Sequence, residues 1–230
     1  MRRDGRSWKM IENLSKIWAK YSYVYMNGLV GTIWLSIVTV GCATVFGTLL
    51  AILKISKFKP GNWLVDIYLE IIRGTPTLLQ IYFFWLVLPK MVSFEISDTT
   101  SIIAALVFNA SAYICEIIRA GIQAVDIGQT EAALSLGMTA GHTMTKIILP
   151  QALKNILPAL GNEFITMLKQ TSLASIFFIT ELTTAYRTVQ SATYLAIPAL
   201  LISGMIYLVL NFVLSRCMSL LEKKMKSNER

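Results

Sequence analysis

Residues 29–53 read LVGTIWLSIVTVGCATVFGTLLAIL, a stretch without a charged side chain. A helix needs roughly 20 predominantly apolar residues to cross the hydrocarbon core of a bilayer, and this stretch exceeds that length. Ala43, Gly47 and Ala51 repeat at every fourth position within it, a spacing that permits close contact with a second helix. The stretch therefore predicts a membrane-spanning helix that packs against a neighbour in the same chain, with a dimer interface as the alternative.

The rest of the chain has the same apolar character. Of its 230 residues, 55% are hydrophobic and only 15% are charged, and the mean hydropathy is +0.59. Four further spans are predicted at 67–88, 102–118, 156–179 and 195–214. The third is short and contains the polar residues Asn109, Ser111 and Glu116. We expect an all-α membrane protein with about five transmembrane helices.

The predicted membrane domain covers residues 27–220 and is preceded by an amphipathic tail, residues 1–26. Apolar residues such as Ile11, Leu14 and Trp18 recur there at helical spacing, opposite charged ones. This pattern is typical of a helix lying in the membrane interface, and no cleavable signal peptide is expected. A short basic tail, residues 221–230, completes the predicted organisation.

Lys and Arg residues suggest how the chain is oriented in the membrane. With five spans, most of the basic loop residues fall on the same side as the C-terminus, and only Lys90 and Arg187 fall on the other side. Basic loops favour the cytoplasm, so the C-terminus is predicted inside and the N-terminus outside. The basic N-terminal tail, with Arg2, Arg3 and Arg6, opposes this assignment. We interpret the net charge of +8 as a topology signal, with no nucleic-acid partner.

The longest polar connection, residues 119–155, is predicted on the cytoplasmic side. Residues 130–136 have the pattern of a short helix that Gly137 stops. Thr139 is placed to cap a second helix, which Pro150 is expected to end. Two short helices in a cytoplasmic loop are typical of a docking element, although an ordinary amphipathic connection between two spans is the alternative.

Particular motifs in this loop resemble a known family. Glu131-Ala132-Ala133-Leu134-Ser135-Leu136-Gly137, followed by Ile147-Ile148-Leu149-Pro150, is similar to the glutamate-alanine-alanine loop of ABC importer permeases. Further matches extend the resemblance over nearly the whole chain and narrow it to polar amino acid permeases of the histidine, glutamine, arginine and cystine type. They are Arg73-Gly74-Thr75-Pro76, Ser111-Ala112-Tyr113 with Glu116 and Arg119, Gly128-Gln129, Asn162-Glu163, and Lys169-Gln170-Thr171-Ser172-Leu173.

The resemblance implies a transmembrane subunit of an ATP-driven importer in the cytoplasmic membrane. Its implied partners are two ATP-binding subunits, a second permease subunit (identical or related), an extracytoplasmic solute-binding protein and membrane lipid. The ATPase-coupling residues it implies are Glu131, Ala132, Ala133, Gly137 and Pro150. A polar amino acid is the implied substrate, with another small polar solute as the alternative.

The sequence Gly74-Thr75-Pro76 interrupts the predicted second span. Thr75 could cap the following half-helix and Pro76 suits its first position, which would direct unpaired backbone N–H groups toward an anionic group such as a substrate carboxylate. A kink whose backbone groups are satisfied by neighbouring helices is the alternative.

Charged residues at membrane depth are costly and should face a cavity or each other. A zwitterionic solute needs partners of both signs. The candidate substrate-pathway residues are Glu70, Arg73, Thr75, Asn162, Glu163 and Lys169. Internal pairing or a subunit interface is the alternative for each.

Several patterns of other functional classes are missing from the sequence. There is no G-x-x-x-x-G-K-[ST] loop, no H-E-x-x-H pattern and no G-x-S-x-G pattern. We therefore expect no catalytic residue, no metal and no bound cofactor in this chain, and ATP hydrolysis in a separate subunit. A channel-like subunit that works without ATP is the remaining alternative.

Overall fold

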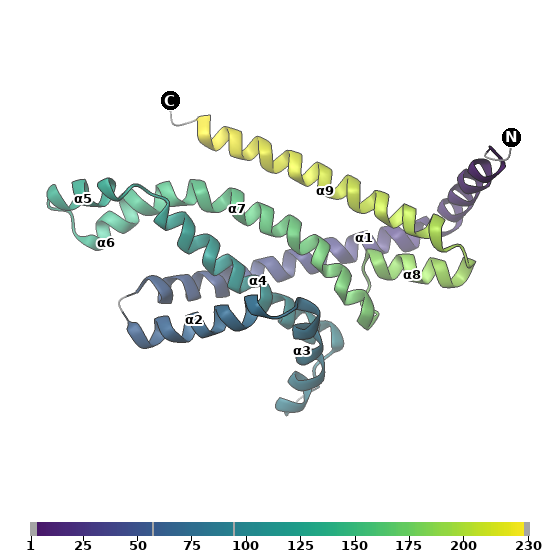
Figure 1. The fold of residues 1–230 in the computed structure, drawn as a ribbon, viewed down its shortest axis with the longest axis horizontal. Helices are drawn as coiled ribbons and strands as arrows, with labels where there is room; N and C mark the ends of the chain where they lie inside the picture. Colours follow the sequence, from purple (N-terminus) through teal and green to yellow (C-terminus); the bar gives the residue numbers. More distant parts are fainter. Residues whose placement is uncertain (1–3, 57, 94, 228–230) are drawn as a thin grey trace.

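The computed structural model describes residues 4–56, 58–93 and 95–227, and over these ranges the chain is helical without any strand (Figure 1). The helices are α1 (Asp4–Ile55), α2 (Lys59–Gly74), α3 (Thr77–Met91), α4 (Asp98–Gln123), α5 (Ile127–Ser135), α6 (Ala140–Thr143), α7 (Leu149–Gln170), α8 (Leu182–Thr193) and α9 (Ala196–Ser227). A π-helical segment, Met144–Ile148, joins α6 to α7, and a 3₁₀ segment, Thr171–Phe177, follows α7. The predicted all-α membrane fold is confirmed.

Three described helices are long and apolar enough to cross a membrane: α1, α4 and α9. Helices α2 and α3 are together long and apolar enough as well, with a bend of 109° between them that fits a broken span or a re-entrant loop. Helix α7 covers most of the predicted fourth span but is not among them, since it carries polar residues such as Asn162, Glu163 and Lys169. The helix also ends earlier than predicted, at Gln170, and continues as the 3₁₀ segment.

Helix α1 is longer than the first predicted span and joins it to the N-terminal tail without a break. Its 52 residues correspond to about 78 Å, nearly twice the thickness of a bilayer with its headgroups. Figure 1 shows the dark purple N-terminal part at an angle to the rest of α1. An interfacial location for this part stays a prediction. Residues 1–3 and 228–230 of the two predicted tails lie outside the described residues.

Helix α4 is the centre of the fold and packs most extensively on α1. Ala105, Leu106 and Ile114 of α4 are completely buried, as are Ala43 and Ala51 of α1. A Cβ added at Gly47 would lie 2.9 Å from the carbonyl oxygen of Ser111, closer than side chains normally approach. The small residues of α1 therefore pack within the chain, as predicted.

The break between α2 and α3 occurs where it was predicted, but its capping differs. Thr75 and Pro76 both have extended backbone angles, so α3 begins at Thr77 and Pro76 is its N-cap. The Thr75 hydroxyl donates to the carbonyl of Ile71 at 2.7 Å and therefore belongs to the end of α2. The predicted roles of Thr75 as cap and Pro76 as first helical residue are wrong, because a residue before proline avoids the helical region and Pro76 itself remains extended.

A buried amide network stabilises this break. The Gln80 amide nitrogen donates to the carbonyl of Ile72 at 2.7 Å, and to the carbonyl and hydroxyl of Thr75 at 3.1 and 2.8 Å. Its oxygen accepts from Asn109 of α4 at 2.9 Å. Gln80 and Asn109 are 7% and 1% exposed. These bonds satisfy carbonyl groups at the end of α2 and do not involve the N–H groups that begin α3, so the kink and the anion site both stay predictions for this break.

Replacing Gln80 by Leu should lower the melting temperature of the purified protein by about 5 °C. The substitution removes the Gln80 bonds to two carbonyls and leaves the Asn109 amide nitrogen only its 3.4 Å bond to the Thr77 hydroxyl, a loss of roughly 1–3 kcal/mol. Thermal unfolding in detergent measures the effect, with Gln129→Leu on the exposed side of α5 as control. Equal melting temperatures for the two variants would show that the network does not stabilise the break.

Helix α8 was not predicted, and it is fixed to α1 and α9 by buried polar contacts. Its N-cap Glu181 is completely buried and accepts from the Thr183 N–H at 2.7 Å and the Tyr207 hydroxyl at 2.9 Å. Burial raises the pKa of this carboxyl above its usual range, and the hydrogen bonds partly offset that shift. The Leu182 N–H donates to the Thr32 hydroxyl at 3.1 Å. These bonds join three helices at the end of the molecule opposite α5 and α6.

Candidate functional site

The first candidate site is the hairpin formed by residues 127–148, which we call the docking hairpin. Asp126 caps α5 by accepting from the Gly128 N–H at 2.7 Å, so the helix starts three residues earlier than predicted. Gly137 has φ +83°. The N–H groups of Gly137 and Met138 donate to the carbonyls of Leu134 and Ala133 at 2.9 and 3.1 Å. This left-handed C-cap suits glycine, which confirms that Gly137 stops the helix.

The second half of the docking hairpin starts as predicted and ends differently. The Thr139 side chain caps α6 by accepting from the His142 N–H at 3.4 Å. Pro150 does not end this helix, because the backbone continues through the π-helical segment into α7. The N–H of Leu149 bonds to the carbonyl of Met144, five residues back, so the helical register changes just before the proline. Pro150 then lies in the first turn of α7, where its missing N–H is tolerated.

The docking hairpin presents both polar and apolar groups to its surroundings. Glu131, Ala132 and Gly137 are exposed, whereas Ala133 is 5% exposed and packs inward. Leu136 at the tip is 84% exposed. Sequence reasoning singled out the charged and small residues and missed this exposed leucine, although it stands within the same motif. An apolar side chain beside a carboxylate on a projecting hairpin is typical of a protein-binding surface.

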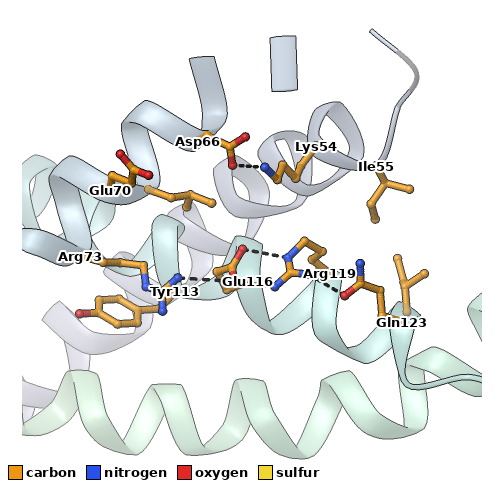
Figure 2. A pocket seen from close by; sticks show the side chains of 11 residues that line it. Lys54, Ile55, Asp66, Glu70, Arg73, Tyr113, Glu116, Arg119 and Gln123 are labelled. Atoms are coloured by element: carbon orange, nitrogen blue, oxygen red, sulfur yellow. Dashed lines mark hydrogen bonds and ion pairs between the residues drawn. The ribbon is translucent and has the colours of Figure 1, made fainter. Parts of the chain in front are cut away.

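A cleft of about 890 Å³ lies between the last turn of α1, the middle of α2 and the second half of α4 (Figure 2). We call it the charged cleft. Its charged lining residues are Lys54, Asp66, Glu70, Arg73, Glu116 and Arg119. Positive and negative groups are equal in number, so the cleft suits a ligand that carries both charges.

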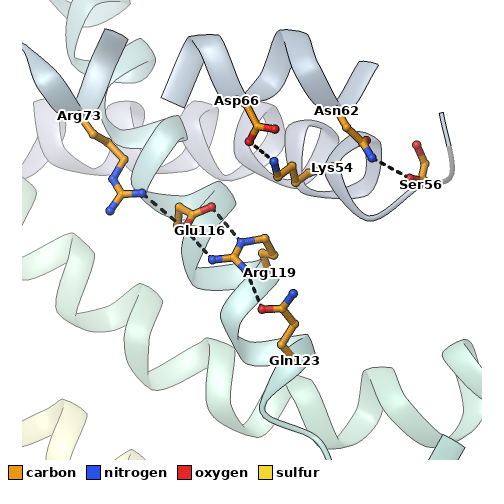
Figure 3. A network of polar contacts seen from close by, with 8 residues as sticks. All are labelled: Lys54, Ser56, Asn62, Asp66, Arg73, Glu116, Arg119 and Gln123. Atoms are coloured by element: carbon orange, nitrogen blue, oxygen red, sulfur yellow. Dashed lines mark hydrogen bonds and ion pairs between the residues drawn. The ribbon is translucent and has the colours of Figure 1, made fainter. Parts of the chain in front are cut away.

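Ion pairs across the charged cleft join three helices (Figure 3). Lys54 of α1 pairs with Asp66 of α2. Glu116 of α4 accepts from Arg119 Nε at 3.0 Å and Nη2 at 2.8 Å. A nitrogen of Arg73, at the end of α2, lies 3.4 Å from the same Glu116 carboxylate. Helix α2 is therefore linked by charge to α1 on one side and to α4 on the other.

The structure separates the predicted substrate-pathway residues into two groups. Glu70 and Arg73 line the charged cleft, and Thr75 follows them at the helix break. Asn162, Glu163 and Lys169 lie on α7 and do not line this cleft. Sequence reasoning did not identify Asp66 as a site residue. Its only distinguishing feature in the sequence is a carboxylate among the apolar residues of α2.

Within the residues that the structure describes, no group of three His, Cys, Asp or Glu side chains is placed to hold a metal ion. The expectation that this chain binds no metal or cofactor stays a prediction.

Comparison with known proteins relates this geometry to membrane transport. Residues 43–227 match the family described as "Binding-protein-dependent transport system inner membrane component". The chain is 38% identical over 204 residues to the "Arginine transport system permease protein ArtQ" of Bacillus subtilis (strain 168), covering 89% of this chain and 93% of that protein. It is 35% identical over 216 residues to the "Probable glutamine ABC transporter permease protein GlnM" of the same strain, covering 94% and 99%.

Solved structures share the fold. A crystal structure of an amino acid ABC transporter with histidines matches with a TM-score of 0.86 at 42% identity, over 90% of this chain and 96% of that chain. An inward-facing structure of the methionine transporter MetNI matches with a TM-score of 0.76 over 88% of this chain and 96% of that one, and its 16% identity indicates the fold alone.

Proposed function

The chain belongs to the family of binding-protein-dependent transport system inner membrane components, and we propose that it carries polar amino acids through the cytoplasmic membrane while its docking hairpin engages an ATP-binding subunit. It is a permease subunit of an ABC importer, like the relatives that are identical at more than a third of the aligned residues. The substrate class follows from those relatives, which are named for arginine and glutamine transport.

The single observation that carries the docking proposal is the construction of the hairpin. Two capped helices meet at Gly137 and expose Glu131, Ala132 and Leu136 together. On one side a short connection joins the hairpin to α4, and on the other the hairpin passes through the π-helical segment into α7. A displacement of the hairpin by a partner would therefore be transmitted to two long helices at once, which is what alternating access requires.

The proposed assembly contains two ATP-binding subunits and two permease chains. The two permease chains are identical or related. Helix α9 supports the association of two permease subunits, because only 17% of its most apolar 18-residue stretch is buried within this chain. Four or five spans also give too little wall to enclose a solute pathway. The family description implies a binding protein, and we propose that it is extracytoplasmic and delivers the amino acid.

The arrangement of the helices supports the predicted orientation. Figure 1 shows α5, α6 and the C-terminal end of α9 at one end of the molecule, and the N-terminus with α8 at the other. If the docking hairpin meets an ATP-binding subunit in the cytoplasm, the C-terminus is cytoplasmic and the N-terminus lies outside.

We propose that both groups of predicted residues contact the solute along its route. Asn162, Glu163 and Lys169 on α7 supply polar contacts at membrane depth, and Glu70, Arg73 and Thr75 lie closer to the cytoplasmic end. Each group contains a positive and a negative residue. This suits a zwitterionic solute, because each of its charges then has a partner of opposite sign at a depth where an unpaired charge is costly.

Replacing Glu131 by Lys tests the docking role. The reversed charge should reduce the amount of ATP-binding subunit that co-purifies with the permease about tenfold, since a close interfacial charge pair contributes on the order of 1.5 kcal/mol or more. Glu95→Lys, in the connection between α3 and α4, is the matched control because Glu95 is also exposed and lies away from the hairpin. Undiminished co-purification with Glu131→Lys would count against docking at this surface.

One transport measurement distinguishes the proposed importer from a channel-like subunit that works without ATP. Reconstituted complex should accumulate a labelled amino acid only when ATP is present on the hairpin side. Equal flux without ATP would favour the channel.

A further inference from the structure

The charged cleft lies close to the docking hairpin along the chain. Its α4 wall extends from Tyr113 to Gln123, the last residue of α4, and α5 begins at Ile127. Its α1 wall is the final turn of that helix, at Lys54 and Ile55. With the orientation proposed above, the cleft opens at the cytoplasmic end of the permease.

Two opposite charges in this cleft are left incompletely paired. Glu70 makes no hydrogen bond or ion pair with any residue that the structure describes. Arg73 lies one helical turn further along α2, at a spacing where Glu and Arg often pair. Its guanidinium points instead toward Glu116, as Figure 2 shows, and that carboxylate already accepts two hydrogen bonds from Arg119. Both Glu70 and Arg73 line the cleft and retain free bonding capacity.

We propose that the charged cleft is a binding site for the α-amino and α-carboxylate groups of an amino acid on the cytoplasmic side, and that its occupation slows the transport cycle. The inference rests on the proposed function. The planar fork of Arg73 suits a carboxylate, and Glu70 accepts from the ammonium group. The volume of about 890 Å³ leaves space for a side chain of any size. Because the side chain of Arg73 is 47% exposed, the affinity is modest, on the order of 1 mM.

The bound amino acid would act through the ion pair between α2 and α4. Its carboxylate competes with Glu116 for Arg73, and Glu116 keeps its two bonds to Arg119. The charge link between α2 and α4 is then lost, and α4 is joined to the docking hairpin through the short connection that ends at Asp126. A ligand that occupies the open cleft also stabilises the state in which the cleft is open, so it delays the return to the opposite state. Amino acid that has accumulated inside thereby inhibits further import.

Ligand-detected saturation-transfer NMR tests the site directly. The sample is the purified permease with its ATP-binding subunits, without nucleotide or binding protein. L-arginine should bind with an apparent Kd near the millimolar range. Agmatine, which lacks the carboxylate, and N-acetyl-L-arginine, which lacks the ammonium group, should bind at least tenfold more weakly. This pattern would identify recognition of the main-chain groups of the amino acid.

Variants assign that binding to the charged cleft. Arg73→Gln and Glu70→Gln should each raise the apparent Kd for L-arginine about tenfold. Lys59→Gln, an exposed position at the start of α2 outside the cleft, should leave it unchanged. If Arg73→Gln fails to assemble with its ATP-binding subunits, Arg73→Lys keeps the charge without the fork and should raise the Kd several-fold. Unaltered binding in the Arg73 and Glu70 variants, or a loss of binding caused by Glu163→Gln alone, would place the ligand elsewhere and overturn the inference.

Transport in proteoliposomes separates this inference from the proposed function. With ATP and the hairpin side in the lumen, lumenal L-arginine at 10-fold its apparent Kd should reduce uptake by wild type at least twofold, and agmatine should not. Uptake without this inhibition overturns the regulatory step and leaves the permease function intact. Absence of any ATP-driven amino acid uptake removes the proposed function, and the NMR experiment still decides whether the cleft binds.

Discussion

Replacing Gly137 by Ala should reduce ATP-driven uptake about tenfold. Gly137 has φ +83°, a conformation that an L-residue adopts at a loss of about 1–2 kcal/mol. No atom lies within 4 Å of the position that an added Cβ would take, so the effect comes from the backbone alone. The strained turn would open the left-handed cap between α5 and α6 and change how the docking hairpin presents Glu131. Uptake into proteoliposomes and ATP hydrolysis are measured side by side.

Gly141→Ala is the matched control for this experiment. Gly141 lies in α6 of the same hairpin, also has free space around the added Cβ, and has no positive φ. Alanine favours the helix there. Uptake should therefore stay at the wild-type rate. Equal activity in the two variants would show that the left-handed turn is not needed for coupling.

Replacing Gly31 by Ala should lower the melting temperature by roughly 5–10 °C and reduce the yield of folded protein. A Cβ at this position of α1 would overlap the carbonyl oxygen of Thr180. That carbonyl belongs to the backbone just before Glu181, which the contacts of Glu181 with Thr183 and Tyr207 hold in place. The overlap cannot be relieved by a side-chain rotation, so helix and connection must separate, at a loss of about 3 kcal/mol.

Gly41→Ala provides the comparison on the same helix. Gly41 is exposed, and nothing lies within 4 Å of an added Cβ. Its melting temperature should equal or slightly exceed that of the wild type, because alanine is the better helix former. If Gly31→Ala melts at the same temperature as Gly41→Ala, the close contact between α1 and the segment before α8 does not contribute to stability.

The position of each helix was largely predictable because it follows from local patterns. Apolar length predicted α1, α4 and α9, and Gly74 with Pro76 predicted the break between α2 and α3. Gly137 predicted the end of the first hairpin helix and Thr139 the start of the second. The errors are also local in origin. Pro150 was expected to end a helix, but a single π-helical turn before it changed the hydrogen-bond register and allowed the helix to continue.

The function was accessible from the sequence because the docking hairpin is one continuous segment. Its residues are neighbours along the chain, so their order and spacing were enough to indicate the resemblance that the family match then confirmed. Neither α8 nor its buried N-cap Glu181 could be recognised in the same way. The partners of Glu181, such as Tyr207, are provided by a different helix far along the chain.

The sequence by itself determined that the chain is helical and membrane-spanning and that two short helices meet at Gly137, since these depend on apolar length and on the backbone preferences of glycine and proline. Only the tertiary structure decided which polar residues meet. It brought Lys54, Asp66 and Glu116 from three helices into one cleft, paired Gln80 with Asn109, and left Glu163 on α7, outside that cleft. The physical reason is that the meeting of side chains depends on how helices cross and rotate against each other, and that packing is set by contacts between residues distant in sequence.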